Sequence, residues 1–150
     1  ADTLERSLEI KSSGEQLFQS VQVTWNILER STTEAIENAV KAGYGIIVKE
    51  ALANGRLTDR NTEPEFQDKL KVITEIADEH QVGIDAIAIA YILHQPWISV
   101  VLSGAAQKSH LDSNLESLGI ELHPGEIEKL NQLAESSEEY WQTRSELEWN

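Results

Sequence analysis

GIIV, at residues 45–48, is a short continuous apolar run that is followed at once by the charged pair Lys49-Glu50. Such a run is typical of a strand that is buried on both faces, as the strands of parallel sheets are. Asn54-Gly55, a few residues further on, is a turn signal. The segment therefore predicts a buried strand that ends at Lys49 and opens into a loop.

Two further strands are expected on either side of this run. Ser20 to Trp25 alternates with β-branched residues, which is typical of a strand. Ile98 to Leu102 is a third segment rich in β-branched residues. Helical patterns separate the three segments, and strands joined through helices pair in parallel by right-handed crossovers. The sequence therefore predicts an α/β fold with three parallel strands.

The helices are predicted from apolar spacing and from residues typical of helix ends. Ser31 to Glu34 supplies capping residues for the helix after the first strand, and Gly43 ends that helix. Ser109 with Asp112 resembles a weak capping box. Tyr140 to Asn150 is expected to be irregular. The helices are expected over residues 2–10, 31–42, 65–80, 84–93, 109–118 and 126–134.

Three parallel strands do not make a self-sufficient sheet. Their two outer edges would be unpaired, and parallel sheets need cover on both faces. Leu4, Leu8 and Ile10 have near-helical spacing, so a helix is expected to be under way at the first residue. The sequence therefore predicts one domain, residues 1–150, that is a piece of a larger architecture.

Composition limits the partners and the location of the protein. The formal net charge of −14 argues against nucleic acid and anionic membrane as partners. The absence of cysteine excludes disulfides and thiolate chemistry and fits a cytoplasmic location. No window resembles a membrane span or a signal peptide. A phosphate-bearing ligand would need local cations, and the candidates are Lys49, Arg56, Arg60 and Lys108.

Other catalytic chemistries have no support in the residue pattern. His80, His94, His110 and His123 have no partners at metal-ligand spacing, so structural or surface roles are favoured. The sequence has no nucleophile elbow, P-loop or GxGxxG motif. The acidic run from Glu135 to Glu139 is most simply interpreted as a solvated face or helix end.

Three segments, in this order and spacing, resemble the C-terminal half of the aldo-keto reductase family. Val21 to Glu29 is similar to the sixth strand of the family's barrel and its exit. Gly45 to Leu57 looks like the seventh strand and the loop beneath the cofactor pyrophosphate. Val100 to Leu115 looks like the eighth strand and the adenosine-binding helix. The resemblance implies a partial (β/α)8 TIM barrel and a nicotinamide cofactor, NADP or NAD.

The resemblance also implies a cofactor site at the carboxyl ends of the strands, where such barrels bind ligands. Gln22 would bond the nicotinamide carboxamide, Lys49 would lie on the nicotinamide or near the pyrophosphate, and Asn114 would bond adenine. The alternatives are an interior polar residue for Gln22 and surface side chains for Lys49 and Asn114. The other cofactor-binding candidates are Glu50, Ala51, Leu52, Gly104, Ala106, Lys108, His110 and Ser113.

Several of these positions depart from the family's pattern. Glu50 replaces a small hydroxyl residue, and its charge beside phosphates is unexpected. His110 stands where arginine or glutamine is usual, and Ser113 where glutamate is usual. Lys108 could add charge for a 2′-phosphate. The resemblance favours NADP, while the departures leave NAD open.

The family's catalytic tyrosine, lysine and aspartate lie on strands that have no counterpart here. A catalytic tyrosine needs a lowered pKa to donate its proton. Tyr44 and Tyr91 are expected at a strand start and in a buried helix, so neither fits that role. Trp25 would either lie near the substrate or serve only as a packing residue. Aromatic residues that would cover either the substrate or the barrel's flank are Tyr140, Trp141 and Trp149.

Two functional hypotheses remain in view. In the first, the chain is part of an NADP-dependent reductase of small aldehydes or ketones, is inactive alone and needs the missing N-terminal half. In the second, it is a non-catalytic half-barrel module that pairs with itself or with another chain. A truncated piece of a longer protein is a further possibility.

Overall fold

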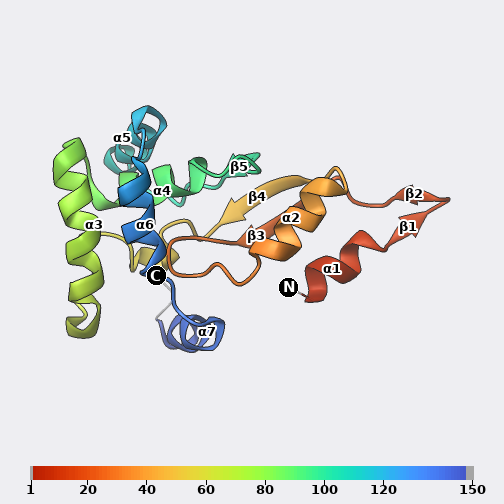
Figure 1. The fold of residues 1–150 in the computed structure, drawn as a ribbon, viewed down its shortest axis with the longest axis horizontal. Helices are drawn as coiled ribbons and strands as arrows, with labels where there is room; N and C mark the ends of the chain where they lie inside the picture. Colours follow the sequence, from red (N-terminus) through yellow and green to blue (C-terminus); the bar gives the residue numbers. More distant parts are fainter. Residues whose placement is uncertain (1, 148–150) are drawn as a thin grey trace.

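The computed structural model describes residues 2–147, in which helices alternate with strands (Figure 1). The main sheet consists of β3 (Ser20–Thr24), β4 (Gly45–Lys49) and β5 (Val100–Val101). β4 is the middle strand and pairs in parallel with both neighbours. The predicted α/β fold with three parallel strands is therefore confirmed, although the third strand is shorter than expected.

Helices and short 3-10 turns make up most of the remaining chain. Their bounds are α1 (Asp2–Leu8), α2 (Thr33–Lys41), η1 (Ala53–Gly55), η2 (Pro64–Phe66), α3 (Gln67–His80), α4 (Ile84–Leu93), α5 (Lys108–Glu116), η3 (Ser117–Gly119), α6 (Pro124–Asn131) and α7 (Ser137–Glu146). Helix α2 connects β3 to β4, and the pair α3 and α4 connects β4 to β5. None of the helices within residues 2–147 combines the length and the apolar composition of a membrane-spanning segment.

The two faces of the sheet are covered differently. Ile46 and Val48 are fully buried, whereas Ile47 between them is partly exposed. Side chains alternate along a strand, so Ile47 faces the other side, in register with Gln22 on β3 and Val100 on β5, both exposed. The expectation that residues 45–48 are buried on both faces is therefore wrong.

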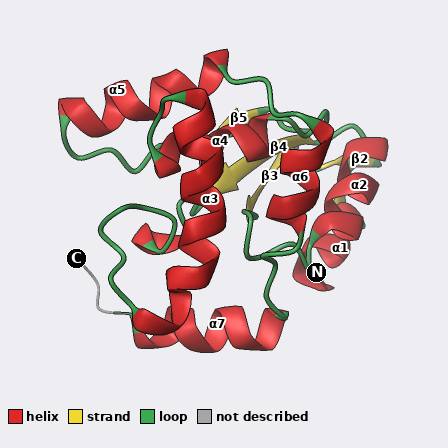
Figure 2. Cartoon of the chain, turned by 60° about the vertical axis from the view of Figure 1, so that its left-hand side comes forward, coloured by secondary structure: helices red, strands yellow, loops and turns green. Residues whose placement is uncertain are grey.

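The hydrophobic core lies between the covered face of the sheet and the helices, which stand in front of the strands in Figure 2. Every residue of α4 from Ala86 to Ile92 is buried, as expected for a helix that is apolar on all sides. Helix α3 is amphipathic and adds Ile73 and Ile76 to the same core. The opposite face of the sheet, with the row Gln22, Ile47 and Val100, is the open face.

A hairpin that the sequence did not indicate precedes β3. β1 (Lys11–Ser12) pairs antiparallel with β2 (Glu15–Gln16) and projects beyond α1 at one end of the molecule (Figure 1). Ser13 and Gly14 have φ values of 54° and 85°, the positive values that a tight two-residue turn requires. The break predicted after the first helix is therefore the turn of a hairpin.

The C-terminal region is more regular than expected. Residues 137–146 form α7 rather than irregular chain, and the Ser136 hydroxyl caps this helix by accepting a hydrogen bond from the Glu139 N–H at 3.2 Å. Trp149 and Asn150 lie outside the described residues.

The capping box predicted at the start of α5 is absent. That helix begins at Lys108, after Gln107, and no side chain caps it. A capping box is found instead at the start of α6, where the Glu126 carboxylate accepts from the His123 N–H at 2.6 Å. The prediction for Ser109 and Asp112 was therefore wrong, because the helix starts one residue before Ser109.

Candidate functional site

A cleft of about 660 Å³ lies along β3, the outer strand of the sheet. Gln22 and Lys49 both line it, together with Leu4 and Ser7 from α1 and Trp141 from α7. Among residues 2–147, no carboxylate lines this cleft, although the chain carries a net charge of −14. The lining that these described residues provide is therefore a local exception to the acidic character of the protein, and Lys49 is the cation in it.

Gln22 lies in the middle of β3, and Lys49 is the last residue of β4. Lys49 is in register with Thr24, the last residue of β3, so its side chain leaves the sheet at the carboxyl ends of the strands. About a third of the Lys49 side chain, 38 %, is exposed. Such a lysine has room to turn toward a ligand in the cleft.

Glu50 follows β4 and forms ion pairs on two sides. Its Oε1 lies 3.2 Å from Lys49 Nζ and 3.3 Å from Arg144 Nη2, and its Oε2 lies 3.4 Å from Arg144 Nε. Burial raises the pKa of the Glu50 carboxyl, but the hydrogen bonds and charges of Arg144 and Lys49 outweigh burial and hold that pKa below its usual value. The negative charge of Glu50, which was unexpected beside phosphates, is thus compensated by Lys49 and Arg144.

The loop after β4 has an unusual backbone. Glu50, Ala53, Asn54 and Gly55 have φ values of 55°, 47°, 56° and 90°, in the left-handed region. The turn predicted at Asn54-Gly55 is present within η1. Buried Ala51 offers no side chain to a ligand, so any contact at this position would come from the backbone.

Asn26 holds the ends of two strands together, a role that the sequence did not suggest. It is fully buried just after β3, and its Nδ2 donates to the Glu50 carbonyl at 2.9 Å and to the Tyr140 hydroxyl at 3.1 Å. Its Oδ1 accepts from the N–H groups of Leu28 and Glu29. Asn26 directly follows the strand expected from the sequence, Ser20 to Trp25, and an asparagine at such a position is a turn signal.

Asn114 is buried on α5 beside the exit of β5. Its Nδ2 donates to Ser103 Oγ at 2.8 Å, whereas its Oδ1 is buried and has no hydrogen-bond partner among residues 2–147. A buried acceptor without a partner is costly, and a ligand donor would remove that cost. The surface interpretation of Asn114 is therefore wrong.

The remaining cofactor candidates lie in the segment around the start of α5. Gly104 and Ala106 are exposed and His110 is partly exposed. Lys108 is exposed and pairs with Asp112 at 2.9 Å, while Ser113 Oγ donates to Asp85 Oδ1 at 2.9 Å.

The candidates thus form two groups, one in the cleft along β3 and one after β5. Gln22 and Lys49 share the cleft, and Asn114 contacts the segment after β5. These two regions adjoin, because the Leu102 N–H donates to the Val48 carbonyl at 2.8 Å. Parallel strands place their carboxyl ends together, so a long ligand could contact both groups.

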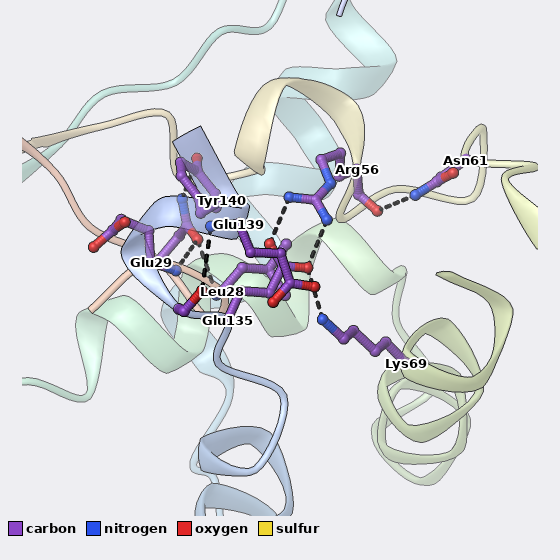
Figure 3. Close-up of polar contacts among 10 residues, drawn as sticks. Leu28, Glu29, Arg56, Asn61, Lys69, Glu135, Glu139 and Tyr140 are labelled. Atoms are coloured by element: carbon purple, nitrogen blue, oxygen red, sulfur yellow. Dashed lines mark hydrogen bonds and ion pairs between the residues drawn. The ribbon is translucent and has the colours of Figure 1, made fainter. Parts of the chain in front are cut away.

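Arg56, a phosphate candidate, is engaged elsewhere. Its guanidinium makes two hydrogen bonds to the Glu135 carboxylate, at 2.6 and 2.9 Å, and Lys69 Nζ lies 2.6 Å from the same carboxylate (Figure 3). The Glu135 side chain is only 2 % exposed. The interpretation of the acidic run as a solvated face is therefore wrong for Glu135.

Some aromatic residues pack in the core, and others line the cleft. Trp25 is buried, stacks on Tyr91 at 5.6 Å between ring centroids, and donates from Nε1 to Thr33 Oγ1 at 2.9 Å. Tyr140 is also buried, whereas Trp141 is 42 % exposed and lines the cleft. Packing is thus the role of Trp25 and Tyr140, whereas a ligand in the cleft could touch Trp141 or Phe18, which also lines it and is 42 % exposed.

Tyr91 and Tyr140 do not have the electrostatics of a proton donor. Burial raises the pKa of Tyr91, and it raises the pKa of Tyr140 to about 12. A general acid near neutral pH needs the opposite shift. Tyr44 is buried at the start of β4, as expected.

Histidine and acidic side chains do not form a metal site in the region that the structure covers. His80 Nε2 lies 2.9 Å from Glu126 Oε1 and joins the end of α3 to the start of α6. No group of three potential ligands that could hold a metal ion occurs within residues 2–147.

Comparisons with known proteins point to one family. The model of the aldo/keto reductase family matches residues 2–135. A Saccharomyces cerevisiae protein named aryl-alcohol dehydrogenase AAD14 is 28 % identical over 144 residues, which cover 81 % of this chain and 38 % of that protein. Another from the same yeast, named aryl-alcohol dehydrogenase AAD10, is 25 % identical, with 81 % of this chain and 50 % of that protein covered.

A solved structure agrees with these matches. The crystal structure of a thermostable aldo-keto reductase, Tm1743, with the inhibitor epalrestat has a TM-score of 0.62 and 25 % identity, covering 75 % of this chain and 38 % of that chain. The α/β arrangement described above is consistent with part of a TIM barrel. The chain spans about half or less of the length of these relatives.

Proposed function

Because the chain belongs to the aldo/keto reductase family, we propose that it supplies the cofactor-binding part of an NADP-dependent reductase of aldehydes or ketones. The observation that supports this most directly is the cleft shared by Gln22 and Lys49 at the edge of the parallel sheet. In this proposal residues 1–150 are the C-terminal half of a barrel, and the protein acts in the cytoplasm.

The residues present fit a dinucleotide. The unpartnered Oδ1 of Asn114 suits a donor such as the adenine amino group. Lys49 would pair with phosphate, Gln22 would bond the carboxamide, and the backbone at Glu50, Ala51 and Leu52 would line the pyrophosphate. The group around the start of α5 would hold the adenosine end; it consists of the exposed residues Gly104, Ala106 and Lys108 and the partly exposed residues His110 and Ser113.

The cofactor, when bound, would supply a hydride to the substrate carbonyl. The chain's own residues would hold and orient it, and the open cleft beside Trp141 would admit a small carbonyl compound. The names of the yeast relatives favour an aryl carbonyl. The proton would come from a tyrosine outside this chain, because burial raises the pKa of both Tyr91 and Tyr140.

The test is a titration of the chain with NADPH, followed by an aldehyde-reduction assay after the missing half-barrel is added. Lys49→Gln should weaken NADPH binding about tenfold through loss of a charged phosphate contact. Lys41→Gln, which removes the same charge from an exposed position at the end of α2, should leave affinity unchanged. Failure of the reconstituted barrel to bind NADPH or to reduce any aldehyde would refute the proposal.

The two edges of the sheet favour a second candidate, a non-catalytic assembly module. β3 and β5 are the outer strands of their sheet, and Val100 and Leu102 beside the β5 edge are 46 % and 42 % exposed. Unpaired edges with exposed apolar side chains pair readily with other chains. Sedimentation distinguishes the candidates: a well-folded monomer that binds NADPH would exclude the assembly module.

A further inference from the structure

Glu50 places a fixed negative charge beside the proposed phosphate site. Its backbone is held in the left-handed region at φ 55°, and its carbonyl accepts from Asn26 Nδ2 and from the Ala53 N–H, both at 2.9 Å. Its side chain is only 12 % exposed. The carboxylate therefore cannot easily move away when an anion approaches.

The two cations on Glu50 bind it differently. Arg144 places two nitrogens against the two carboxylate oxygens, at 3.3 and 3.4 Å, and its side chain is 17 % exposed. Lys49 makes one contact, at 3.2 Å, and its side chain is 38 % exposed and lines the cleft. Arg144 is thus the better-held partner, and Lys49 is the cation that can turn toward a ligand.

Helix α7 brings Arg144 to this position. The Tyr140 hydroxyl, one turn earlier on α7, accepts from Asn26, the residue that also holds the Glu50 carbonyl. The ion pair therefore lies within a set of contacts that fixes α7 against the carboxyl ends of β3 and β4. Within this set the Glu50 carboxylate contacts two cations, Lys49 beside it and Arg144 on α7.

We infer that Arg144 is a positioning residue for phosphate binding: by neutralising Glu50 it leaves the Lys49 ammonium available to an anionic ligand. The inference rests on the dinucleotide site proposed above. It adds Arg144, on α7, as a residue that determines the affinity for the cofactor. Without Arg144, the Glu50 carboxylate would retain Lys49 and would repel phosphate.

The test is NADPH titration of four forms of the chain: unaltered, Arg144→Gln, Glu50→Gln and the double variant. Arg144→Gln should weaken binding about tenfold, and the double variant should recover to within about twofold of the unaltered chain, since the uncompensated anion is gone. Glu50→Gln alone should bind NADPH at least as tightly as the unaltered chain. Thermal unfolding of each form separates affinity from folding.

The outcomes distinguish this inference from the proposed function. If the unaltered chain does not bind NADPH, the proposed cofactor site is wrong, and the inference falls with it. If it binds and Arg144→Gln binds equally well, or if the double variant stays as weak as Arg144→Gln, only the role of Arg144 is wrong. Should Arg144→Gln fail to fold, a Glu50→Gln form that binds NADPH more weakly than the unaltered chain would overturn the inference.

Discussion

At the scale of single residues, Glu135 connects three distant parts of the chain. Its carboxylate pairs with Arg56 from the loop after β4 and with Lys69 on α3, and its N–H donates to the Leu28 carbonyl at 2.8 Å (Figure 3). Burial raises the pKa of this carboxyl, but the two cations outweigh burial and lower it. Glu135 is therefore a buried anion, and both Arg56 and Lys69 stabilise its charged form.

Replacing Glu135 with glutamine should lower the free energy of unfolding by about 3 kcal/mol, since removing one member of a buried ion pair leaves the others uncompensated. Urea denaturation measures this change. Glu128→Gln removes the same charge from an exposed position on α6 and should shift stability by less than about 0.5 kcal/mol. Equal losses in the two variants would show that net charge, not the buried pair, sets the stability.

The role of a single residue could be predicted from the sequence only where the order of the strands determines where that residue lies. Gln22 and Lys49 could be assigned to neighbouring parallel strands because both strands have clear patterns. The pairs Arg56–Glu135 and Glu50–Arg144 are separated by 79 and 94 positions, and no local pattern connects them. In a chain with 26 acidic residues, most carboxylates look solvated, so a buried one cannot be singled out.

At the scale of elements, the end of α2 shows how one glycine determines a boundary. Gly43 has φ 87°, its N–H donates to the Val40 carbonyl at 2.9 Å, and the Tyr44 N–H donates to the Ala39 carbonyl at 3.0 Å. These two bonds define a Schellman motif, which requires a left-handed residue. The prediction that Gly43 ends the helix is confirmed.

Gly43→Ala should lower the free energy of unfolding by about 1 kcal/mol, because the added Cβ strains the left-handed backbone. Within residues 2–147, no heavy atom outside Gly43 and its two chain neighbours lies within 4 Å of that Cβ, so steric overlap adds nothing to the cost. Gly125→Ala, in the first turn of α6 and equally open, should instead raise stability by a few tenths of a kcal/mol. Thermal melts compare the two, and a loss in both variants would contradict the argument from φ.

Elements with a repeating apolar pattern were predictable, and elements held by tertiary contacts were not. Helix α4 is recognisable because apolar residues fill it, whereas α7, SEEYWQTRSE, buries only Tyr140. That helix is docked through Asn26 and Glu50, which the local sequence cannot show. The hairpin strands β1 and β2 have two residues each, too few for an alternating pattern.

At the scale of the whole molecule, the sheet has one covered face and one open face. The open face explains why Ile47 is only partly buried although the sequence predicts burial on both sides. In a closed barrel this face would point inward, and further strands would pair with β3 and β5. The chain covers 38 to 50 % of its relatives' length, which agrees with the arc of a barrel seen here.

Stability should be lost at both extremes of pH, for opposite reasons. The pKa values of Glu50, Glu126 and Glu135 are lowered in the folded protein, so the unfolded chain binds more protons near and below pH 4.5. Their contribution is present above that pH and is lost as pH falls through the folded pKa values. Urea midpoints between pH 3 and 6 should show this loss, and Glu135→Gln should make it shallower; an unchanged slope would remove Glu135 from the explanation.

At alkaline pH the relevant group is Tyr140, whose pKa burial raises from 10 to about 12. The folded protein then holds the phenol proton at pH values where the unfolded chain has released it, so stability should fall as pH rises from about 10 to 12. Self-repulsion of a chain with a net charge of −14 acts in the same direction, and Tyr140→Phe separates the two effects. The variant loses the hydrogen bond from Asn26, which should lower its free energy of unfolding by about 1 kcal/mol at every pH. It has no phenol to titrate. Its urea midpoint should therefore fall less steeply above pH 10 than that of the unaltered chain, and parallel curves would assign the alkaline loss to charge repulsion alone.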